Sequence, residues 1–466
     1  MNDKKLFAQR ALLPEGWAEN VLIETTADGD IAVVSIGAKP GDARRAAGPL
    51  IPGMPNLHSH AFQRAMAGLT EQAGQSGTAA GDDSFWTWRT LMYDFVGRLT
   101  PEAVEAIAAQ LYVEMLKSGY TSVAEFHYLH HDTDGRPYGD LAEMSERVLA
   151  AAKATGIGIT HLPVLYNAGG FGGKPPGTGQ RRFLNDPERF LRLIEGLRSR
   201  HRNDRQIRIG IAPHSLRAVT PETLEQAVAG LTAMDPTAPI HIHIAEQTKE
   251  VEDCLAWSRQ RPVEWLFGHQ RVDERWCLIH ATHMNEGETK AVAGSGAVAG
   301  LCPTTEANLG DGFFPAIDYL GLRGQFGIGS DSHISVSPIE ELRWLEYGQR
   351  LVTRRRNRLA AGSSGGSHIG AALYRGALAG GGRALGRNIG RIAAGARADL
   401  LVLDAESPGL IGKAEDTMID AMIFAGNGNP VRDVMVGGKF VVEQGHHPGE
   451  VEIFGQFRSA LGALLA

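Results

Sequence analysis

Short apolar runs alternate with longer amphipathic stretches through the middle of the chain. An apolar run before residue 58 is followed by strand-like runs at 121–126, 156–165, 206–212, 239–245, 276–281, 296–301 and 325–329. Helix-like stretches such as 101–117, 221–233 and 339–352 lie between them, and two of these begin with the N-capping pairs Thr100-Pro101 and Thr220-Pro221. Eight strands that alternate with helices predict an α/β fold, a parallel (β/α)8 TIM-like barrel with its active site at the carboxyl ends of the strands.

The two ends of the chain have a different, β-rich pattern. Apolar runs at 21–23 and 31–36 flank a turn-like segment, 27–30, which predicts a hairpin. Near the other end, 398–404 reads as a strand and 434–442 as a hairpin around Gly437-Gly438. We therefore expect a small β-sandwich domain built from the N-terminal residues 1–51 and the C-terminal residues 391–466, on either side of a barrel at 52–390.

Composition and charge exclude several classes of function. The chain has 466 residues, 43% of them hydrophobic, and a formal net charge of −7, which gives no indication of nucleic-acid binding. No apolar run is long enough to span a membrane, and no signal peptide is evident. The chain has three cysteines, Cys254, Cys277 and Cys302, and they form no Cys-x-x-Cys pair. We therefore expect structural thiols and a reducing, cytoplasmic compartment.

Ligand-capable residues occur where the predicted strands end. The first strand ends in His58-Ser59-His60, whose imidazoles point the same way because side chains alternate along a strand. The fifth, sixth and eighth strands end near His243, His280 and Asp331. Each histidine alone could be an ordinary strand residue, but four strand ends at one barrel mouth predict a metal site. His241, one step deeper in its strand than His243, is expected to be a packed core histidine.

At this point the chain resembles the amidohydrolase superfamily over nearly its whole length. The segment 52–60 is similar to the opening metal motif of that superfamily, and 396–404 to its return into the small β domain. His243 followed by Glu246, His280 and Asp331 resemble the mononuclear deaminase branch, and no lysine ends the fourth strand to bridge two metals. The resemblance implies one Zn²⁺ per subunit held by His58, His60, His243 and Asp331, although iron or manganese could occupy such ligands.

The chemistry explains these residue types. Zinc lowers the pKa of a bound water to roughly 7, which supplies hydroxide at neutral pH. Asp331 is expected to accept the proton of that water, and Glu246 to deliver a proton to a leaving nitrogen. His280 is expected to sit beside the metal and to contact the water or the oxygen of the tetrahedral carbon.

Other residues near the strand ends select the substrate. The segments 56–71, 125–131 and 241–247 resemble N-formimino-L-glutamate deiminases of histidine breakdown. In that family the matching residues contact the substrate, and in this chain they are Gln63, Arg89, Tyr128, His214 and Arg217. Two arginines suit two carboxylates, since guanidinium binds carboxylate through parallel hydrogen bonds. The expected partner is thus a small dicarboxylate, which is hydrolysed to N-formyl-L-glutamate and ammonia.

Several alternatives stay open from the sequence alone. The substrate could be another carboxylate-bearing amidine or guanidine, or a heterocyclic base, and a barrel used only for binding is a more distant alternative. The glycine-rich stretch 168–180 reads either as a surface loop or as a lid over the pocket. His127, His130 and His131 are expected to lie behind the ligands or at the surface, Asn308 is given no role, and we expect a homodimer.

Overall fold

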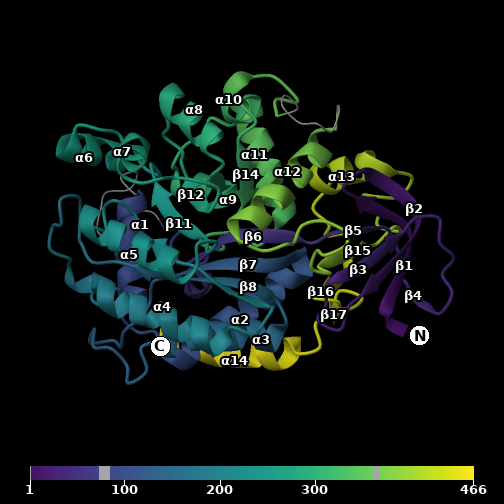
Figure 1. Ribbon diagram of the computed structural model, residues 1–466, viewed down its shortest axis with the longest axis horizontal. Coiled ribbons are helices and arrows are strands. Elements are labelled where there is room, and N and C mark those ends of the chain that lie inside the picture. Colours follow the sequence, from purple (N-terminus) through teal and green to yellow (C-terminus); the bar gives the residue numbers. More distant parts are fainter. Residues whose placement is uncertain (1, 73–83, 360–367) are drawn as a thin grey trace.

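The computed structural model describes residues 2–72, 84–359 and 368–466. The larger part of the molecule is a barrel of parallel strands, which lies to the left of the small β domain in Figure 1. In chain order these strands are β6 (Met54–Ser59), β7 (Tyr120–His127), β8 (Gly158–Leu165), β9 (Ile207–Ile209), β10 (Ala212–Pro213), β11 (Ile240–Ile244), β12 (Trp276–His280), β13 (Val298–Leu301) and β14 (Gln325–Ile328). Parallel bridges from Ser215 to His243 and from Ser59 to Asp331 join the two halves. The predicted barrel is confirmed.

Helices surround the barrel and cover the strands from outside. They are α1 (Phe85–Val96), α2 (Pro101–Ser118), α3 (Glu143–Thr155), α4 (Pro187–His201), α5 (Pro221–Met234), α6 (Thr248–Ser258), α7 (Pro262–His269), α8 (Glu286–Ser295), α9 (Pro303–Leu309), α10 (Ala316–Gly321), α11 (Pro338–Thr353) and α12 (Ile369–Ala384). Short 3₁₀ turns η1 (Ala61–Met66) and η2 (Thr178–Gln180) follow β6 and β8. The side chains of Thr100 and Thr220 accept hydrogen bonds from the backbone of Ala103 and Thr223, which confirms both predicted N-caps.

A small β domain lies at one end of the barrel and contains strands from the N-terminal and the C-terminal parts of the sequence (Figure 1). Its strands are β1 (Asn2–Leu13), β2 (Gly16–Thr25), β3 (Ile31–Ser35), β4 (Ala43–Arg45), β5 (Leu50–Pro52), β15 (Leu400–Leu403), β16 (Val431–Val436) and β17 (Lys439–Val442). They form one mixed sheet, in which β5 pairs with β15 and so joins the N-terminal segment to the C-terminal one. The predicted union of the two ends is confirmed, and the boundaries at 51 and 390 stay a prediction.

The last helices of the chain return to the barrel. After α13 (Glu415–Phe424), the terminal helix α14 (Glu450–Leu465) lies beside α2 (Figure 1). Lys117 of α2 forms an ion pair of 2.7 Å with Glu450, and Arg98 donates to the carbonyl of Leu464. The terminal helix therefore packs on the barrel helix α2.

Three strands differ by more than one residue from those that the sequence predicts. The fourth strand, expected at 206–212, is divided into β9 and β10. Gly156 and Gly296 end α3 and α8 in the left-handed conformation, with φ of 78° and 83°, so β8 and β13 begin two residues later than expected. Glycine adopts this conformation without a Cβ clash, which favours it as a helix C-cap.

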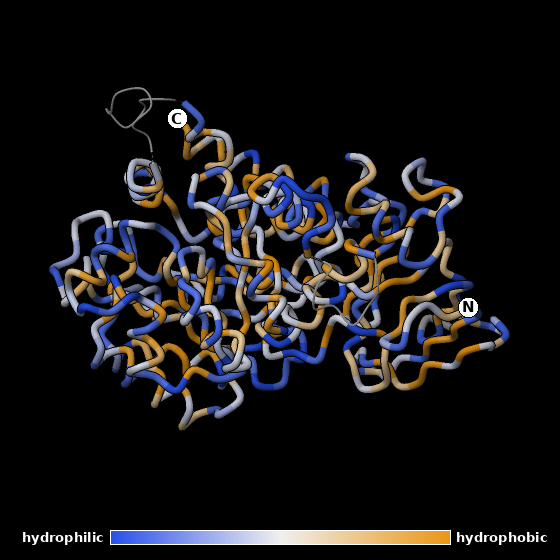
Figure 2. Tube along the Cα trace, turned by 90° about the horizontal axis from the view of Figure 1, so that it is seen from above, coloured by the Kyte–Doolittle hydropathy of each residue, from blue (hydrophilic) through white to orange (hydrophobic). Residues whose placement is uncertain are grey.

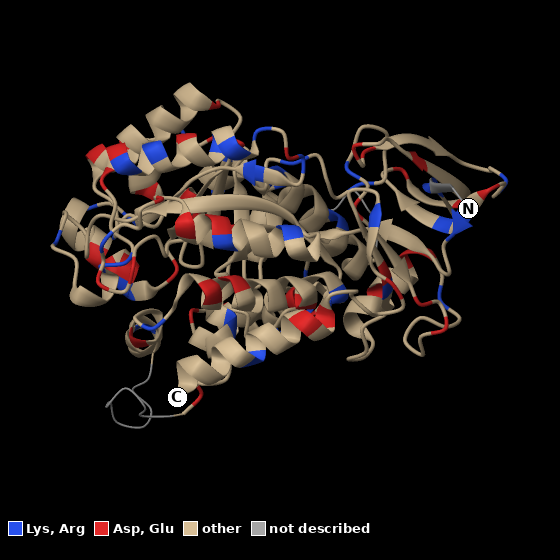
Figure 3. Cartoon of the chain, turned by 90° about the horizontal axis from the view of Figure 1, so that it is seen from below, with Lys and Arg blue, Asp and Glu red and all other residues tan. Residues whose placement is uncertain are grey.

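The surface and the interior differ in polarity as expected. Hydrophobic residues follow the inner strands in Figure 2, whereas hydrophilic residues follow many of the outer loops. Basic and acidic residues are interspersed along the outer helices in Figure 3. Among the described residues, no helix combines the length and the apolar character that crossing a bilayer requires.

Candidate metal centre and substrate pocket

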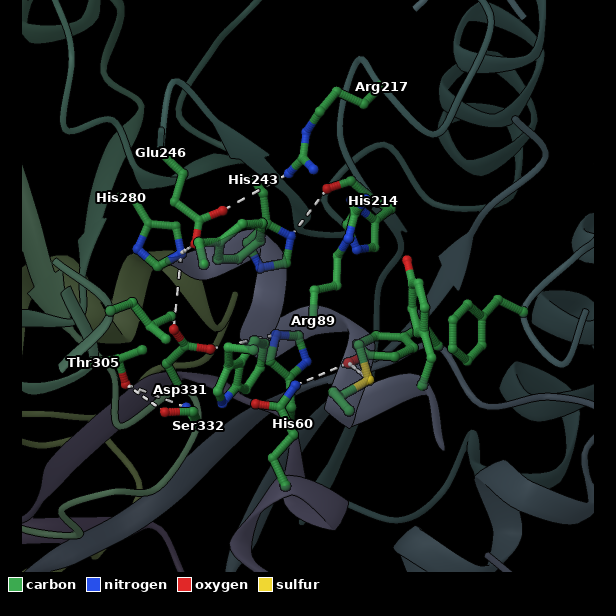
Figure 4. A pocket seen from close by; sticks show the side chains of 18 of the residues that line it. His60, Arg89, His214, Arg217, His243, Glu246, His280, Thr305, Asp331 and Ser332 are labelled. Atoms are coloured by element: carbon green, nitrogen blue, oxygen red, sulfur yellow. Dashed lines mark hydrogen bonds and ion pairs between the residues drawn. The ribbon is translucent and has the colours of Figure 1, made fainter. Parts of the chain in front are cut away.

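Four predicted ligands lie near the carboxyl ends of β6, β11 and β14, and Figure 4 shows three of them, His60, His243 and Asp331. Nε2 of His58 and Nε2 of His60 each lie 3.4 Å from Oδ1 of Asp331. Nε2 of His243 lies 3.1 Å from Nε2 of His58. All four residues are buried. His58 thus lies in two groups of ligand-capable atoms, one with His60 and Asp331 and one with His243 and His280.

The outer hydrogen bonds of these histidines suit metal binding. Nδ1 of His60 lies 2.9 Å from the carbonyl oxygen of Phe126, and Nδ1 of His243 lies 3.0 Å from that of His214. A carbonyl oxygen only accepts, so each Nδ1 carries the proton and each Nε2 keeps its lone pair for a ligand. Burial lowers the pKa of His58 and His243 well below the usual value, which keeps both rings neutral. The donor set fits a divalent transition metal.

The backbone at the strand ends turns the ligands into the mouth. Asp331 and His280 have φ of 46° and 66°, left-handed values that are uncommon for residues with a Cβ and that cluster at functional sites. At the seam between β14 and β6, a Cβ on Gly329 would lie 2.7 Å from the Cβ of His58. Because Gly329 has no Cβ, the strand end that carries Asp331 lies close to His58.

Glu246 and His280 lie together on one side of the cluster. Nε2 of His280 is 3.8 Å from Oε1 of Glu246 and 3.8 Å from Oδ2 of Asp331. Burial raises the pKa of Glu246 to about 7. Burial alone would lower the pKa of His280, but the carboxylates of Glu246, Glu306 and Asp331 outweigh it and raise that pKa to about 10. A carboxyl group with a pKa near neutrality, such as Glu246, suits acid–base catalysis.

The five predicted substrate contacts line one pocket together with His60, His243, Glu246, His280 and Asp331. Gln63 donates to the hydroxyl of Tyr128 over 2.9 Å. Nη2 of Arg217 lies 3.8 Å from Oε2 of Glu246, and its guanidinium carbon lies 5.6 Å from the ring of Trp86. Arg89 lies on α1, 4.6 Å above that same ring. His214 packs edge-on against Tyr166. The structure thus brings both arginines into the pocket that contains the predicted metal ligands (Figure 4).

Two buried carboxylates behind this pocket were not predicted from the sequence. Glu250 accepts hydrogen bonds from the backbone N–H groups of Ala245 and Glu246, and lies 3.7 Å from Nε of Arg217. Glu306 accepts from the backbone of Cys302 and lies 3.3 Å from Nδ1 of His280. Glu250 holds the end of β11, and Glu306 orients the ring of His280. One feature of the sequence could have indicated the role of Glu250: it comes four residues after Glu246, at the start of a helix.

The other histidines have structural contacts. His241 is buried and lies 2.8 Å from the carbonyl oxygen of Ala384, which confirms the predicted core histidine. His130 and His131 bond to the carbonyl oxygens of Val164 and Leu184. His127 lies behind the ligands, 5.3 Å from the ring of His161. His127, His130 and His131 are therefore buried outside the group of predicted ligands, as expected.

The glycine-rich stretch 168–180 is ordered by its own backbone bonds and reaches the pocket through Gln180. Gly169 donates to Lys174, and the ring of Phe171 stacks on Trp257. Gln180 is buried and contacts the hydroxyl of Tyr166, a residue of the pocket wall. Gln180 therefore supports the pocket wall from behind through Tyr166, and a lid function stays a prediction.

Comparison with known proteins agrees with this geometry. Residues 50–441 match the model of the amidohydrolase family, and residues 4–46 match "Formimidoylglutamate deiminase HutF, N-terminal domain". A formimidoylglutamate deiminase of Pseudomonas aeruginosa is 56% identical, with 99% of both chains covered. A crystal structure of an amidohydrolase from Brucella melitensis is 52% identical, with a TM-score of 0.92 over 99% of this chain and all of that one.

A more distant structure has the same fold. An adenosine deaminase from Xanthomonas campestris, crystallised with bound zinc, is 22% identical and superimposes with a TM-score of 0.80 over 99% of this chain and 98% of that chain. The family models cover both the barrel and the small β domain. The chain belongs to the amidohydrolase family, and its N-terminal segment is of the formimidoylglutamate deiminase type.

Proposed function

We propose that the chain is a metal-dependent formimidoylglutamate deiminase, which hydrolyses N-formimino-L-glutamate to N-formyl-L-glutamate and ammonia in histidine degradation. The observation that carries this conclusion is the 56% identity, over 99% of both chains, to the deiminase of Pseudomonas aeruginosa. The pocket supports it independently, because one wall holds a cluster of possible metal ligands and the other wall holds Arg89 and Arg217. A dicarboxylate with a hydrolysable C–N bond matches both walls.

We propose that His58, His60, His243 and Asp331 hold one Zn²⁺ per chain. Two of the imidazoles are already oriented by backbone carbonyls, and the relative from Xanthomonas campestris was crystallised with zinc. When bound, the ion supplies Lewis acidity that lowers the pKa of a water molecule in contact with it. A divalent cation at this point would also lower the pKa of the neighbouring Glu246 and His280.

The residues of the chain divide the proton transfers between them. Asp331 accepts a proton from the attacking water as the oxygen bonds to the formimino carbon. Glu246 donates a proton to the imino nitrogen, which becomes an amino group. Asp331 then passes its proton to that amino group, the hydroxyl on the tetrahedral carbon returns its proton to Glu246, and the C–N bond breaks as ammonia departs. His280 faces both carboxylates and donates a hydrogen bond to the oxygen of the tetrahedral carbon. Glu250 and Glu306 hold Glu246 and His280 in place.

Ammonia release by the zinc-loaded protein tests this function. The substrates are N-formimino-L-glutamate, the guanidino analogue N-carbamimidoyl-L-glutamate, and guanine as a heterocyclic base. We expect ammonia and N-formyl-L-glutamate in equal amounts from the first compound, with a much lower kcat/KM for the other two. A higher kcat/KM for either analogue would assign the site to a different substrate.

We also propose that the protein is a cytoplasmic homodimer. Support for self-association comes from four exposed apolar side chains on and beside one face of α11: Phe313, Trp344, Leu351 and Val352, which are 41–69% exposed. Support for a reducing compartment comes from three buried cysteines, all with free thiols. Light scattering coupled to size-exclusion chromatography measures the mass, and a monomeric mass at working concentration contradicts the dimer.

A further inference from the structure

The pocket extends beyond the arginines to aromatic side chains from three separate elements. Tyr93 lies in α1, Tyr166 directly follows β8, and Phe183 follows η2. The ring of Phe183 lies 6.0 Å from that of Tyr93 and 5.7 Å from that of Tyr166, and all three line the pocket. Neither phenol is among the residues assigned above to the substrate, although the guanidinium carbon of Arg89 lies 5.7 Å from the centre of the Tyr93 ring.

Gln180, at the end of the glycine-rich stretch, fixes the hydrogen-bonding role of these phenols. Its Oε1 accepts a hydrogen bond of 2.7 Å from the backbone N–H of Gly177. Because that N–H only donates, the amide oxygen faces Gly177 and the amide NH₂ faces the phenols. Nε2 accordingly donates to the hydroxyl oxygen of Tyr166 at 2.5 Å and of Tyr93 at 3.4 Å. Each phenol oxygen thus accepts from Gln180, and because the two phenols also hydrogen-bond to each other, one O–H hydrogen of the pair is left to donate to another acceptor.

A second pair of glutamine and tyrosine lines the same pocket. Gln63 donates to the hydroxyl of Tyr128, an expected substrate contact whose ring lies 4.9 Å from that of Phe183. The backbone also lies close to the first pair, since a Cβ on Gly179 would lie 2.9–3.0 Å from the side chain of Tyr93. A glutamine that donates to a phenol oxygen therefore occurs twice in this pocket.

The charges of the pocket differ between its two ends. The acidic residues that line it, Glu246 and Asp331, lie at the metal end (Figure 4). Arg89 and Arg217 both act electrostatically on the hydroxyl of Tyr166, and burial raises the pKa of that phenol, which keeps it a neutral donor. Neutral O–H donors beside guanidinium groups favour an anionic acceptor.

We propose that Tyr93, Tyr166 and Gln180, together with Arg89, form a subsite for the substrate carboxylate that lies farther from the reacting carbon. This inference rests on the proposed function. In N-formimino-L-glutamate the two carboxylate carbons lie three and five bonds from the formimino carbon. Arg217 contacts Glu246 and so takes the nearer carboxylate, while the phenols take the farther one. The subsite selects glutamate derivatives over those whose side chain lacks a carboxylate.

Inhibition constants of two product analogues test the subsite on the metal-loaded enzyme. N-formyl-L-glutamate has both carboxylates, whereas N-formyl-L-norvaline replaces the farther carboxylate by a methyl group. Tyr166→Phe should raise the Ki of N-formyl-L-glutamate about tenfold or more, since it deletes one hydrogen bond to a charged group. The Ki of N-formyl-L-norvaline should stay within about twofold of its wild-type value, the scatter of ordinary surface substitutions.

Gln180→Glu gives a second variant, because it keeps the bond to Gly177 but turns the donor into an acceptor. It should produce the same selective loss, and Tyr347→Phe, whose ring stacks on Phe424 outside the pocket, is the matched control with unchanged constants. Equal shifts for both analogues, or an unchanged Ki of N-formyl-L-glutamate in both variants, would overturn the subsite. Failure of the wild-type enzyme to hydrolyse N-formimino-L-glutamate would instead overturn the proposed function.

Discussion

Replacement of Glu246 by Gln separates proton transfer from binding. Glu246 is buried, and its two oxygens lie 3.8 Å from His280 and 3.8 Å from Arg217. Glutamine keeps the size of the side chain but cannot carry the proton, so we expect kcat to fall about 10²–10⁴-fold, the usual contribution of a positioned general acid. This range corresponds to about 3–5 kcal/mol of transition-state stabilisation.

Binding should change far less than turnover in this variant. Arg217 keeps its second carboxylate, Glu250, at 3.7 Å, and Glu246 is not one of the four proposed metal ligands. We therefore expect zinc content to be unchanged and KM to shift only by a small factor, measured by elemental analysis and by a coupled ammonia assay. Glu252→Gln, which changes an exposed acid on α6, the helix that follows Glu246, is the control. A Glu246→Gln enzyme with wild-type kcat would refute the proton-carrier role.

Three further perturbations have predicted outcomes. Glu250→Gln removes a fully buried negative charge beside Arg217, so KM should rise about tenfold, and steady-state kinetics that show an unchanged KM would contradict this. His243→Ala should remove bound metal and lower the Tm to that of chelator-treated wild-type protein, because metal stabilises only the folded state; equal Tm values before and after chelation argue against a metal centre. Burial raises the pKa of Asp235, but hydrogen bonds from Thr237 and two arginines outweigh it and hold that pKa well below the usual 3.8. Since the pKa is lower in the folded state than in the unfolded state, this stabilisation is present above pH 4 and is lost as the pH falls further. Denaturant titration should therefore find Asp235→Asn less stable than the wild type by about 2 kcal/mol at pH 7, and by less at pH 3.

The barrel could be predicted from the sequence because its strands are buried on both faces. Such strands read as continuous apolar runs, and each predicted run lies within a few residues of an observed strand. The errors are at Gly156 and Gly296, where a left-handed helix cap looks like the start of the following strand. Parallel strands also bring their carboxyl ends to one mouth, so the convergence of His58, His243 and Asp331 followed from the fold.

The supporting side chains could not be predicted, because their identity alone does not show burial. Glu250 and Glu306 have the same sequence signature as solvated helical acids, yet both are buried. Gln180 contacts Tyr93, which lies 87 residues earlier in the chain, and that contact depends on how two loops fold over the mouth. Strand periodicity contains no information about such loop contacts.

The most direct test of the metal centre is a titration of metal-free protein with Zn²⁺, in which bound zinc and ammonia release from N-formimino-L-glutamate are measured together. Activity should rise in proportion to bound zinc and reach its maximum at one ion per chain. Full activity without metal, or a maximum that requires two ions per chain, would contradict a single-ion site built by three histidines and Asp331.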